Sequence, residues 1–193
     1  MLSRRDLVSK YKSLLIENIN KIESKNVIEI MSLLEKTAKE KKTIYVFGNG
    51  GSSTTALHMQ NDFNIGVSRN VDYGYRFVCL SDNIPTITAI ANDYSYNDIF
   101  RKQLEKRLDT GDIIIAISCS GNSENIIKAV EYAKSLGNVV IGITGYDGGK
   151  LQKISNYNFH IDVNNMQIVE DLVLILNHMM MFVFKMENRD INA

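Results

Sequence analysis

The 193-residue chain has little of what marks several large protein classes. Its two cysteines, Cys79 and Cys119, lie outside any CxxC spacing. This excludes a disulfide framework and a zinc ribbon, and it predicts a reducing, cytoplasmic location. The 22 basic and 22 acidic residues cancel, so no excess of charge predicts nucleic acid or an anionic membrane as a partner. Proline occurs once, at Pro85, in a segment (81–86) that is expected to be a loop.

Long apolar runs are scarce as well. The N-terminal segment MLSRRDLVSKYK lacks the apolar core of a signal peptide. The most apolar run, residues 172–184, is shorter than the roughly 20 residues that span a bilayer. Asn177 and His178 also interrupt it. We therefore predict a buried helix here and no membrane partner.

The remaining sequence has the pattern of one α/β domain over residues 1–193. Residues 1–41 are amphipathic and helical in pattern, with Ser3 as a helix cap. Their apolar stripe must be buried against the domain or against a second subunit. Short apolar runs then alternate with helical segments through a core of residues 42–187, which predicts a parallel sheet covered by helices. The predicted strands are residues 43–47, 76–80, 113–118, 139–144 and 157–161.

Two loops rich in serine, glycine and asparagine follow predicted strands. They are GNGGSS at residues 48–53 and SCSGNS at residues 118–123, and each leads into a predicted helix. Glycine lets the backbone approach an anion, and serine hydroxyls with helix N-terminal amides can bind it. Two such loops at non-adjacent strand ends favour a phosphate site over simple helix-capping turns. Neither loop has the lysine of a Walker motif, and Ser53 replaces the third glycine of a dinucleotide fingerprint, so we expect no nucleotide cofactor.

At these loops the chain resembles the sugar isomerase (SIS) family, and in particular its phosphoheptose isomerases. The resemblance covers about residues 43–185. The matching segments are GNGGSS with His58, TAIANDY (residues 88–94) with Ile99 and Phe100, SCSGNS with Asn125, and ITG (residues 143–145) with Asp147 to Lys150.

The resemblance implies a three-layer αβα sandwich with a five-stranded parallel, flavodoxin-like sheet and extra N-terminal helices. It implies a homotetramer whose active sites lie at subunit interfaces. It also implies an aldose–ketose isomerase that converts sedoheptulose 7-phosphate into D-glycero-D-manno-heptose 7-phosphate through an enediol, on the way to lipopolysaccharide or capsule heptose.

Carried over residue by residue, the resemblance also implies a substrate site. Cys119 stands where threonine or serine is usual, and it would contribute through its backbone or be merely a small buried residue. Asp93 would face the sugar hydroxyls or instead close a turn. The implied substrate-binding residues are Asn49, Gly50, Gly51, Ser52, Asp93, Ser118, Cys119, Ser120, Ser123 and Glu170.

Four ionisable residues complete the predicted site. His58 and Asp62 are four apart and share a helix face. Glu170 and His178 are eight apart, about 80° around a helix. The resemblance makes these four the ligands of one zinc ion per subunit in some relatives, with Asp62 as the base at carbon and His178 as its partner at oxygen. Asp62 replaces a usual glutamate, Glu170 a glutamine and Gly66 an arginine. The alternative is that the histidines are partly buried and satisfied by carboxylates.

Other functions stay open from the sequence. The chain would then be a non-catalytic SIS module, such as a sugar-phosphate sensor or a replication-initiation partner. It would otherwise be an isomerase of another phosphosugar, or a nucleotide-binding domain. The four ionisable residues favour an enzyme over a non-catalytic module.

Overall fold

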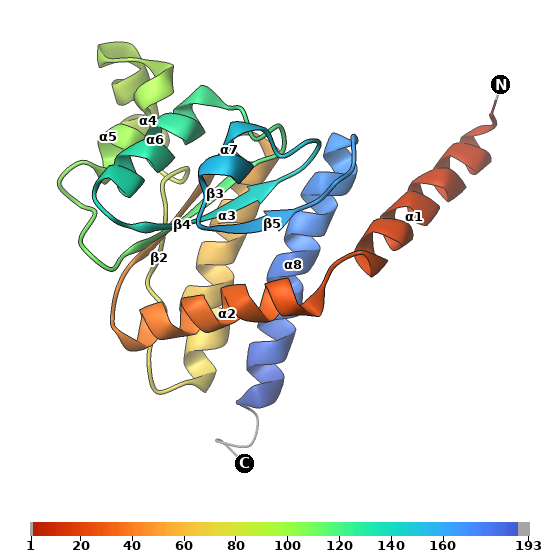
Figure 1. Ribbon diagram of the computed structural model, residues 1–193, viewed down its shortest axis with the longest axis horizontal. Coiled ribbons are helices and arrows are strands. Elements are labelled where there is room, and N and C mark those ends of the chain that lie inside the picture. The colour runs from red at the N-terminus through yellow and green to blue at the C-terminus, as the bar shows by residue number, and fades with distance from the viewer. Residues whose placement is uncertain (1, 189–193) are drawn as a thin grey trace.

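The computed structural model describes residues 2–188, and its centre is a five-stranded parallel sheet with helices on both faces (Figure 1). The strand order is β2-β1-β3-β4-β5. All five predicted strands are confirmed within two residues, because each apolar run is buried between helix layers. The strands are β1 (Ile44–Gly48), β2 (Phe77–Cys79), β3 (Ile113–Ser118), β4 (Val139–Thr144) and β5 (Tyr157–His160).

The two loops rich in serine and glycine follow strands that are neighbours in the sheet. Gly48 at the end of β1 pairs with Ile117 near the end of β3. The expectation of non-adjacent strand ends was wrong. After β1 the chain forms β2 on one side and then crosses to β3 on the other, so strands that are not consecutive in sequence become neighbours. This reversal is the switch point at which open α/β sheets bind ligands.

Alternate strand residues face two helix layers. One layer packs on Ile44 and Val46 and contains α2 (Ser24–Lys39), α3 (Gly51–Asn61), the π-helix η1 (Asp62–Val67), the 3₁₀-helix η2 (Ser68–Asn70) and α8 (Met166–Glu187). The other packs on Tyr45 and Phe47 and contains α4 (Ile84–Asp93), η3 (Tyr96–Asp98), α5 (Arg101–Leu104), α6 (Glu124–Ser135) and α7 (Gly149–Ile154).

Helix α4 includes the segment that was expected to be a loop. Pro85 lies in its first turn, and Asn83 Oδ1 accepts a hydrogen bond from the Thr86 amide at 2.9 Å. Proline is tolerated there because the first amides of a helix have no partner within it. The loop prediction for residues 81–86 is therefore wrong from Ile84 onward.

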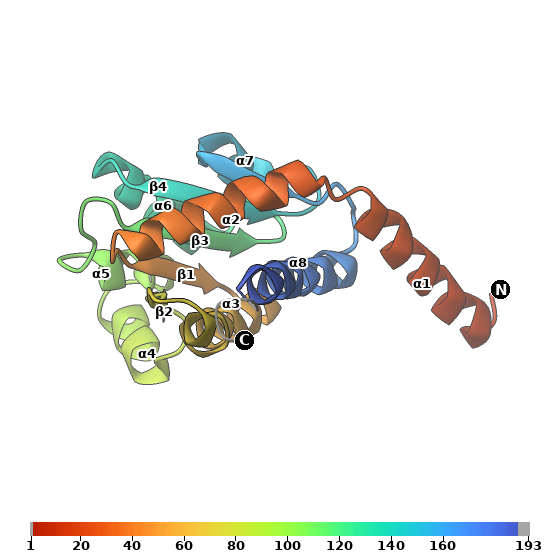
Figure 2. The ribbon, with the colours of Figure 1, turned by 90° about the horizontal axis from the view of Figure 1, so that it is seen from below.

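Helix α1 (Arg4–Asn20) extends away from the body of the molecule, as both views show (Figures 1 and 2). The predicted Ser3 cap is confirmed, since its Oγ accepts from the Asp6 amide at 3.2 Å. Tyr11 joins α1 to α8 by donating to Asp171 Oδ2 at 2.5 Å. Leu7 and Ile16 remain more than half exposed, so the chain itself leaves part of the α1 apolar stripe uncovered.

Helix α8 is longer than the apolar run predicted, and by length and composition alone it could cross a membrane. One face, including Leu172 and Leu176, is buried against the rest of the chain, whereas Phe182 on another face is 66% exposed. The prediction of a buried helix is therefore confirmed for one face. α8 runs beside α3 (Figures 1 and 2).

Candidate active site

The two loops line one pocket of about 400 Å³ beyond the ends of β1 and β3. Nine of the ten predicted substrate-binding residues lie on its wall. Asp93 does not: it is exposed at the end of α4, where its Oδ1 accepts from the side-chain Nδ2 of Asn92 at 2.9 Å. The lining residues are Asn49, Gly50, Gly51, Ser52, Ile117, Ser118, Cys119, Ser120, Ser123, Tyr146, Met166 and Glu170.

The pocket suits an anion because two helices begin at its wall. Gly50 has φ +52°, a conformation that favours glycine, and α3 starts at the next residue. Ser123 is the N-cap of α6, and Ser118 Oγ donates to its hydroxyl at 3.2 Å. The first amides of a helix lack intrahelical acceptors and carry the positive end of its dipole. The residues that line the pocket include no lysine or arginine, so amides and hydroxyls are what it offers to an anion.

A third loop, residues 145–149, supports the loop at 118–123. The Gly145 amide donates to the Cys119 carbonyl at 2.9 Å, and the Leu151 amide donates to the Gly121 carbonyl at 2.8 Å. A Cβ on Gly121 would lie 2.0 Å from the Gly148 oxygen. The loops at residues 118–123 and 145–149 therefore pack backbone against backbone, which holds this part of the pocket wall in one shape.

Cys119 contributes a neutral side chain to this wall. Its Sγ lies 3.8 Å from Ser52 Oγ. Burial raises the pKa of the Cys119 thiol, an effect that the Ser52 hydrogen bond opposes and the Glu170 charge reinforces. Cys119 therefore adds no negative charge near neutral pH.

Glu170 is the charged residue on the wall. Its carboxylate lies over Gly51, where a Cβ would be 2.5 Å from Oε1. It therefore sits beside the first turn of α3, within the space that would receive an anion.

A second group of polar side chains lies further along α3 and α8. Asp62 Oδ2 is 3.2 Å from His58 Nε2 and 3.9 Å from His178 Nε2. The two imidazole nitrogens are 3.4 Å apart. Asp62 is buried at the start of η1, whereas both histidines are exposed. Their ligand atoms lie within 4.8 Å of one another, and two imidazoles with one carboxylate suit zinc.

The structure does not bring Glu170 into this group. Residues eight apart in a helix are separated by about 12 Å along its axis, whatever their angle around it. The four predicted ligands are therefore divided. His58, Asp62 and His178 share one place, and Glu170 lies in the pocket.

Sequence reasoning gave no role in the site to Asn125, Tyr96 or Asn177. Asn49 and Asn125 exchange two side-chain hydrogen bonds of 2.9 Å, and Tyr96 donates to Asn49 Oδ1 at 3.2 Å. Asn177, fully buried, donates to Asp62 Oδ2 at 2.6 Å. The available signal was a polar residue in an apolar run, because a buried amide needs a partner.

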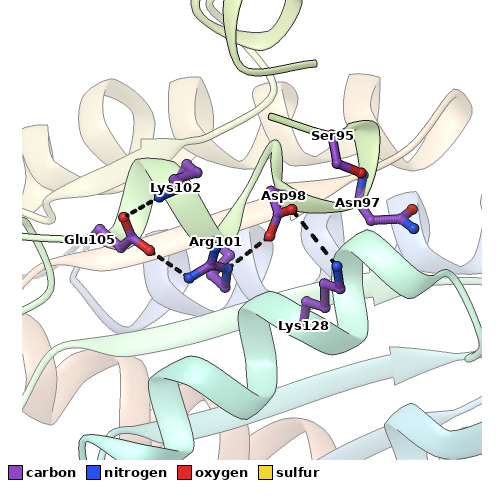
Figure 3. Close-up of polar contacts among 7 residues, drawn as sticks. All are labelled: Ser95, Asn97, Asp98, Arg101, Lys102, Glu105 and Lys128. Atoms are coloured by element: carbon purple, nitrogen blue, oxygen red, sulfur yellow. Dashed lines mark hydrogen bonds and ion pairs between the residues drawn. The ribbon is translucent and has the colours of Figure 1, made fainter. Parts of the chain in front are cut away.

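Ion pairs fix the segment that carries Tyr96. Asp98 accepts from Arg101 at 2.8 Å and lies 3.7 Å from the Lys128 ammonium of α6 (Figure 3). Arg101 and Lys102 also pair with Glu105, at 2.5 and 3.0 Å. The Arg101 hydrogen bond is the main cause that lowers the pKa of Asp98. η3 is therefore tied to α5 and α6, which places Tyr96 beside Asn49.

Comparisons with known proteins find similar sequences and a similar fold. A model of the SIS domain matches residues 9–145. A phosphoheptose isomerase of Fusobacterium nucleatum is 36% identical over 178 residues, which cover 90% of each chain. One of Thermodesulfovibrio yellowstonii is 35% identical over 164 residues, 85% of this chain and 79% of the relative. The structure of phosphoheptose isomerase GmhA from Neisseria gonorrhoeae superposes with a TM-score of 0.86 at 26% identity, over 95% of this chain and 99% of that one.

Proposed function

Because the chain belongs to the SIS-domain family and, within it, to the phosphoheptose isomerases, we propose that it interconverts sedoheptulose 7-phosphate and D-glycero-D-manno-heptose 7-phosphate. It is an aldose–ketose isomerase. The observation that carries the choice of substrate is the distance between its anion pocket and its acid–base group.

Helices α3 and α8 touch at two levels. At the first, Glu170 lies over Gly51 in the pocket. At the second, His58 and His178 meet at 3.4 Å. The two levels are seven residues apart on α3 and eight on α8, which corresponds to roughly 10–12 Å along each helix. An extended seven-carbon chain places its first carbon about 10 Å from a terminal phosphorus, from bond lengths near 1.5 Å. A phosphate in the pocket would thus put C1 and C2 beside the histidines.

The acid–base residues can move the required protons. The Asp62 carboxylate takes the proton from C1 of the ketose, which leaves an enediol, and returns it to C2 to form the aldose. His178 transfers the accompanying proton between O2 and O1. Ser52, Ser118 and Ser120 hold the phosphate, which anchors the reacting end. Asn49 faces the sugar hydroxyls.

The residues at the acid–base group also fit a divalent cation. His58, Asp62 and His178 would hold one ion per subunit, and zinc suits this donor set. A bound cation would polarise the substrate carbonyl.

Kinetics of three variants test the residue roles. Asp62→Asn and His178→Ala should lower kcat on sedoheptulose 7-phosphate, followed by NMR, by about 10²- to 10⁴-fold. His160→Ala is the control, because this third histidine lies on β5, where its ring pairs with Thr144 Oγ1 at 3.0 Å. Wild-type rates in folded Asp62→Asn protein would contradict the roles proposed here.

The same assay in D₂O separates the alternatives. An isomerase incorporates solvent deuterium at carbon, whereas a sugar-phosphate sensor binds the ligand without exchange.

A phosphosugar panel tests the substrate. A pentose 5-phosphate is two carbons shorter, about 2.5 Å by bond lengths, so we expect a lower kcat/KM than for the heptulose. Faster turnover of a pentose or hexose phosphate would overturn the assignment.

We also propose a cytoplasmic homotetramer with residues 1–41 as its assembly segment and residues 42–187 as its catalytic unit. An apolar groove of about 780 Å³ lies between α2 and α8 beside the end of α1, and its lining includes Met31, His178 and Phe182. A second copy that covers this groove would enclose His178, so each site would lie at an interface.

Sedimentation equilibrium should give a tetramer, and Phe182→Asp should dissociate it and lower kcat. Leu136→Asp, on exposed Leu136 outside the groove, is the control. A monomeric wild type would refute this assembly.

A further inference from the structure

Asn177 lies fully buried on α8, one residue before His178, and its side-chain amide donates a 2.6 Å hydrogen bond to Asp62 Oδ2. We propose that Asn177 is a positioning residue, which holds the Asp62 carboxylate in its reactive orientation. This inference rests on the proposed function, from which the role of Asp62 comes.

The direction of this hydrogen bond follows from its partners. An ionised carboxylate can only accept, so the Asn177 NH₂ group, and not its oxygen, must face Asp62. His58 Nε2 approaches the same Oδ2 at 3.2 Å, and the Asn177 contact is the shorter one. None of residues 2–188 donates a hydrogen bond to Asp62 Oδ1. Asn177 therefore fixes one carboxylate oxygen, Oδ2, and leaves Oδ1 to accept a proton from the substrate.

The cost of burying Asn177 supports a specific role. Its Oδ1 is buried without a hydrogen-bond partner among the described residues, a state that destabilises a folded protein. Leu176 and Val173 on the same helix are also buried. Leucine has the same number and branching of side-chain heavy atoms as asparagine, with bulkier methyl groups, and would avoid the cost, but it has no donor for Asp62.

Kinetics, binding and crystallography of Asn177→Leu test the proposal. We expect kcat on sedoheptulose 7-phosphate to fall by about 10- to 100-fold, the range for partners that orient a functional group. The affinity for inorganic phosphate should stay within about twofold, because the pocket lies at the other level of α3 and α8. The thermal midpoint should fall by an amount similar to that of the control variant below, since each replacement removes an unpaired acceptor together with a donor to buried oxygen. In a crystal structure, the Asp62 carboxylate should leave its position beside His58.

Asn138→Leu is the matched control. Asn138 is also buried with an unpartnered Oδ1, and its amide donates to the Asp109 and Asp112 carbonyls. Its replacement should also lower the thermal midpoint but leave kcat unchanged, so a loss of kcat is what distinguishes Asn177 from a buried asparagine with a structural role only.

The outcomes are distinct. Folded Asn177→Leu protein with wild-type kcat, an unmoved Asp62, or a parallel loss of kcat and phosphate affinity would overturn the proposal. If the leucine variant does not fold, Asn177→Ala is judged by the same criteria, because it removes the donor and adds neither bulk nor charge beside Asp62. Failure of the proposed function would be seen in other proteins: the wild type would not convert sedoheptulose 7-phosphate, or folded Asp62→Asn protein would keep the wild-type kcat. In either case, the position of Asp62 in the crystal structure of the Asn177 variant still tests this inference.

Discussion

Replacing Glu170 by glutamine should tighten phosphate binding. The Glu170 carboxylate lies over Gly51 at the start of α3. It faces the pocket, whose lining includes no lysine or arginine. A phosphate dianion would therefore be repelled by a group on the wall that is meant to bind it. Glutamine has nearly the same size and removes the charge.

Coulomb's law sets the size of the effect. A carboxylate and a phosphate dianion about 6 Å apart repel by roughly 1.4 kcal/mol in water and roughly 5.5 kcal/mol at an effective dielectric constant near 20. The pocket is open to solvent, so about 1–2 kcal/mol is a reasonable expectation. This corresponds to a roughly 5- to 30-fold lower Kd for inorganic phosphate.

Isothermal titration at fixed pH and several salt concentrations measures this change. Glu131→Gln is the control, because this variant loses the same charge at a site outside the pocket. Glu131 lies on the surface of α6, where it is paired with Lys150. The gain of Glu170→Gln should shrink as salt rises, since counterions screen the repulsion. A Kd no lower than that of Glu131→Gln would refute the argument and show that the carboxylate leaves the pocket when phosphate enters.

Three further measurements test the structure of the pocket wall. Tyr96→Phe should lower kcat/KM about 2- to 10-fold, as expected for one neutral hydrogen bond, without changing phosphate affinity; Tyr94→Phe, two residues earlier and also more than half exposed, should have no effect. Iodoacetamide should modify Cys119 slowly at pH 7 and faster as the pH rises beyond 9, because burial raises the pKa of its thiol; fast reaction at pH 7, read by mass spectrometry, would contradict this. Gly121→Ala should destabilise the protein to urea by more than Gly137→Ala. Both sites have positive φ, which costs about 1–2 kcal/mol, but a Cβ meets backbone only at Gly121, whereas Gly137 has open space. Equal losses would show that the facing loop can move.

The fold was predictable wherever one local signal dominated. Apolar, β-branched runs such as residues 113–118 are typical of strands buried on both faces, and they became strands. The error at Pro85 has a local cause, because proline is read as a helix breaker although it is favoured in a first turn. The neighbouring positions of β1 and β3 could not be read from either strand, since strand order depends on where the crossovers pass.

The site was predictable as a set of residues but not as an arrangement. A helical wheel compares angles and ignores the rise along the axis, so Glu170 and His178 looked like partners although about 12 Å of helix separates them. Gly51 and His58 are separated by a similar rise along α3. These two separations, one on each helix, are what indicate a long substrate. Asn177 appeared in the sequence only as a break in an apolar run. A polar side chain in a buried helix requires a partner, and Asp62 is one the helix packing supplies. Such a residue in a core helix is therefore a reason to search for the group it binds.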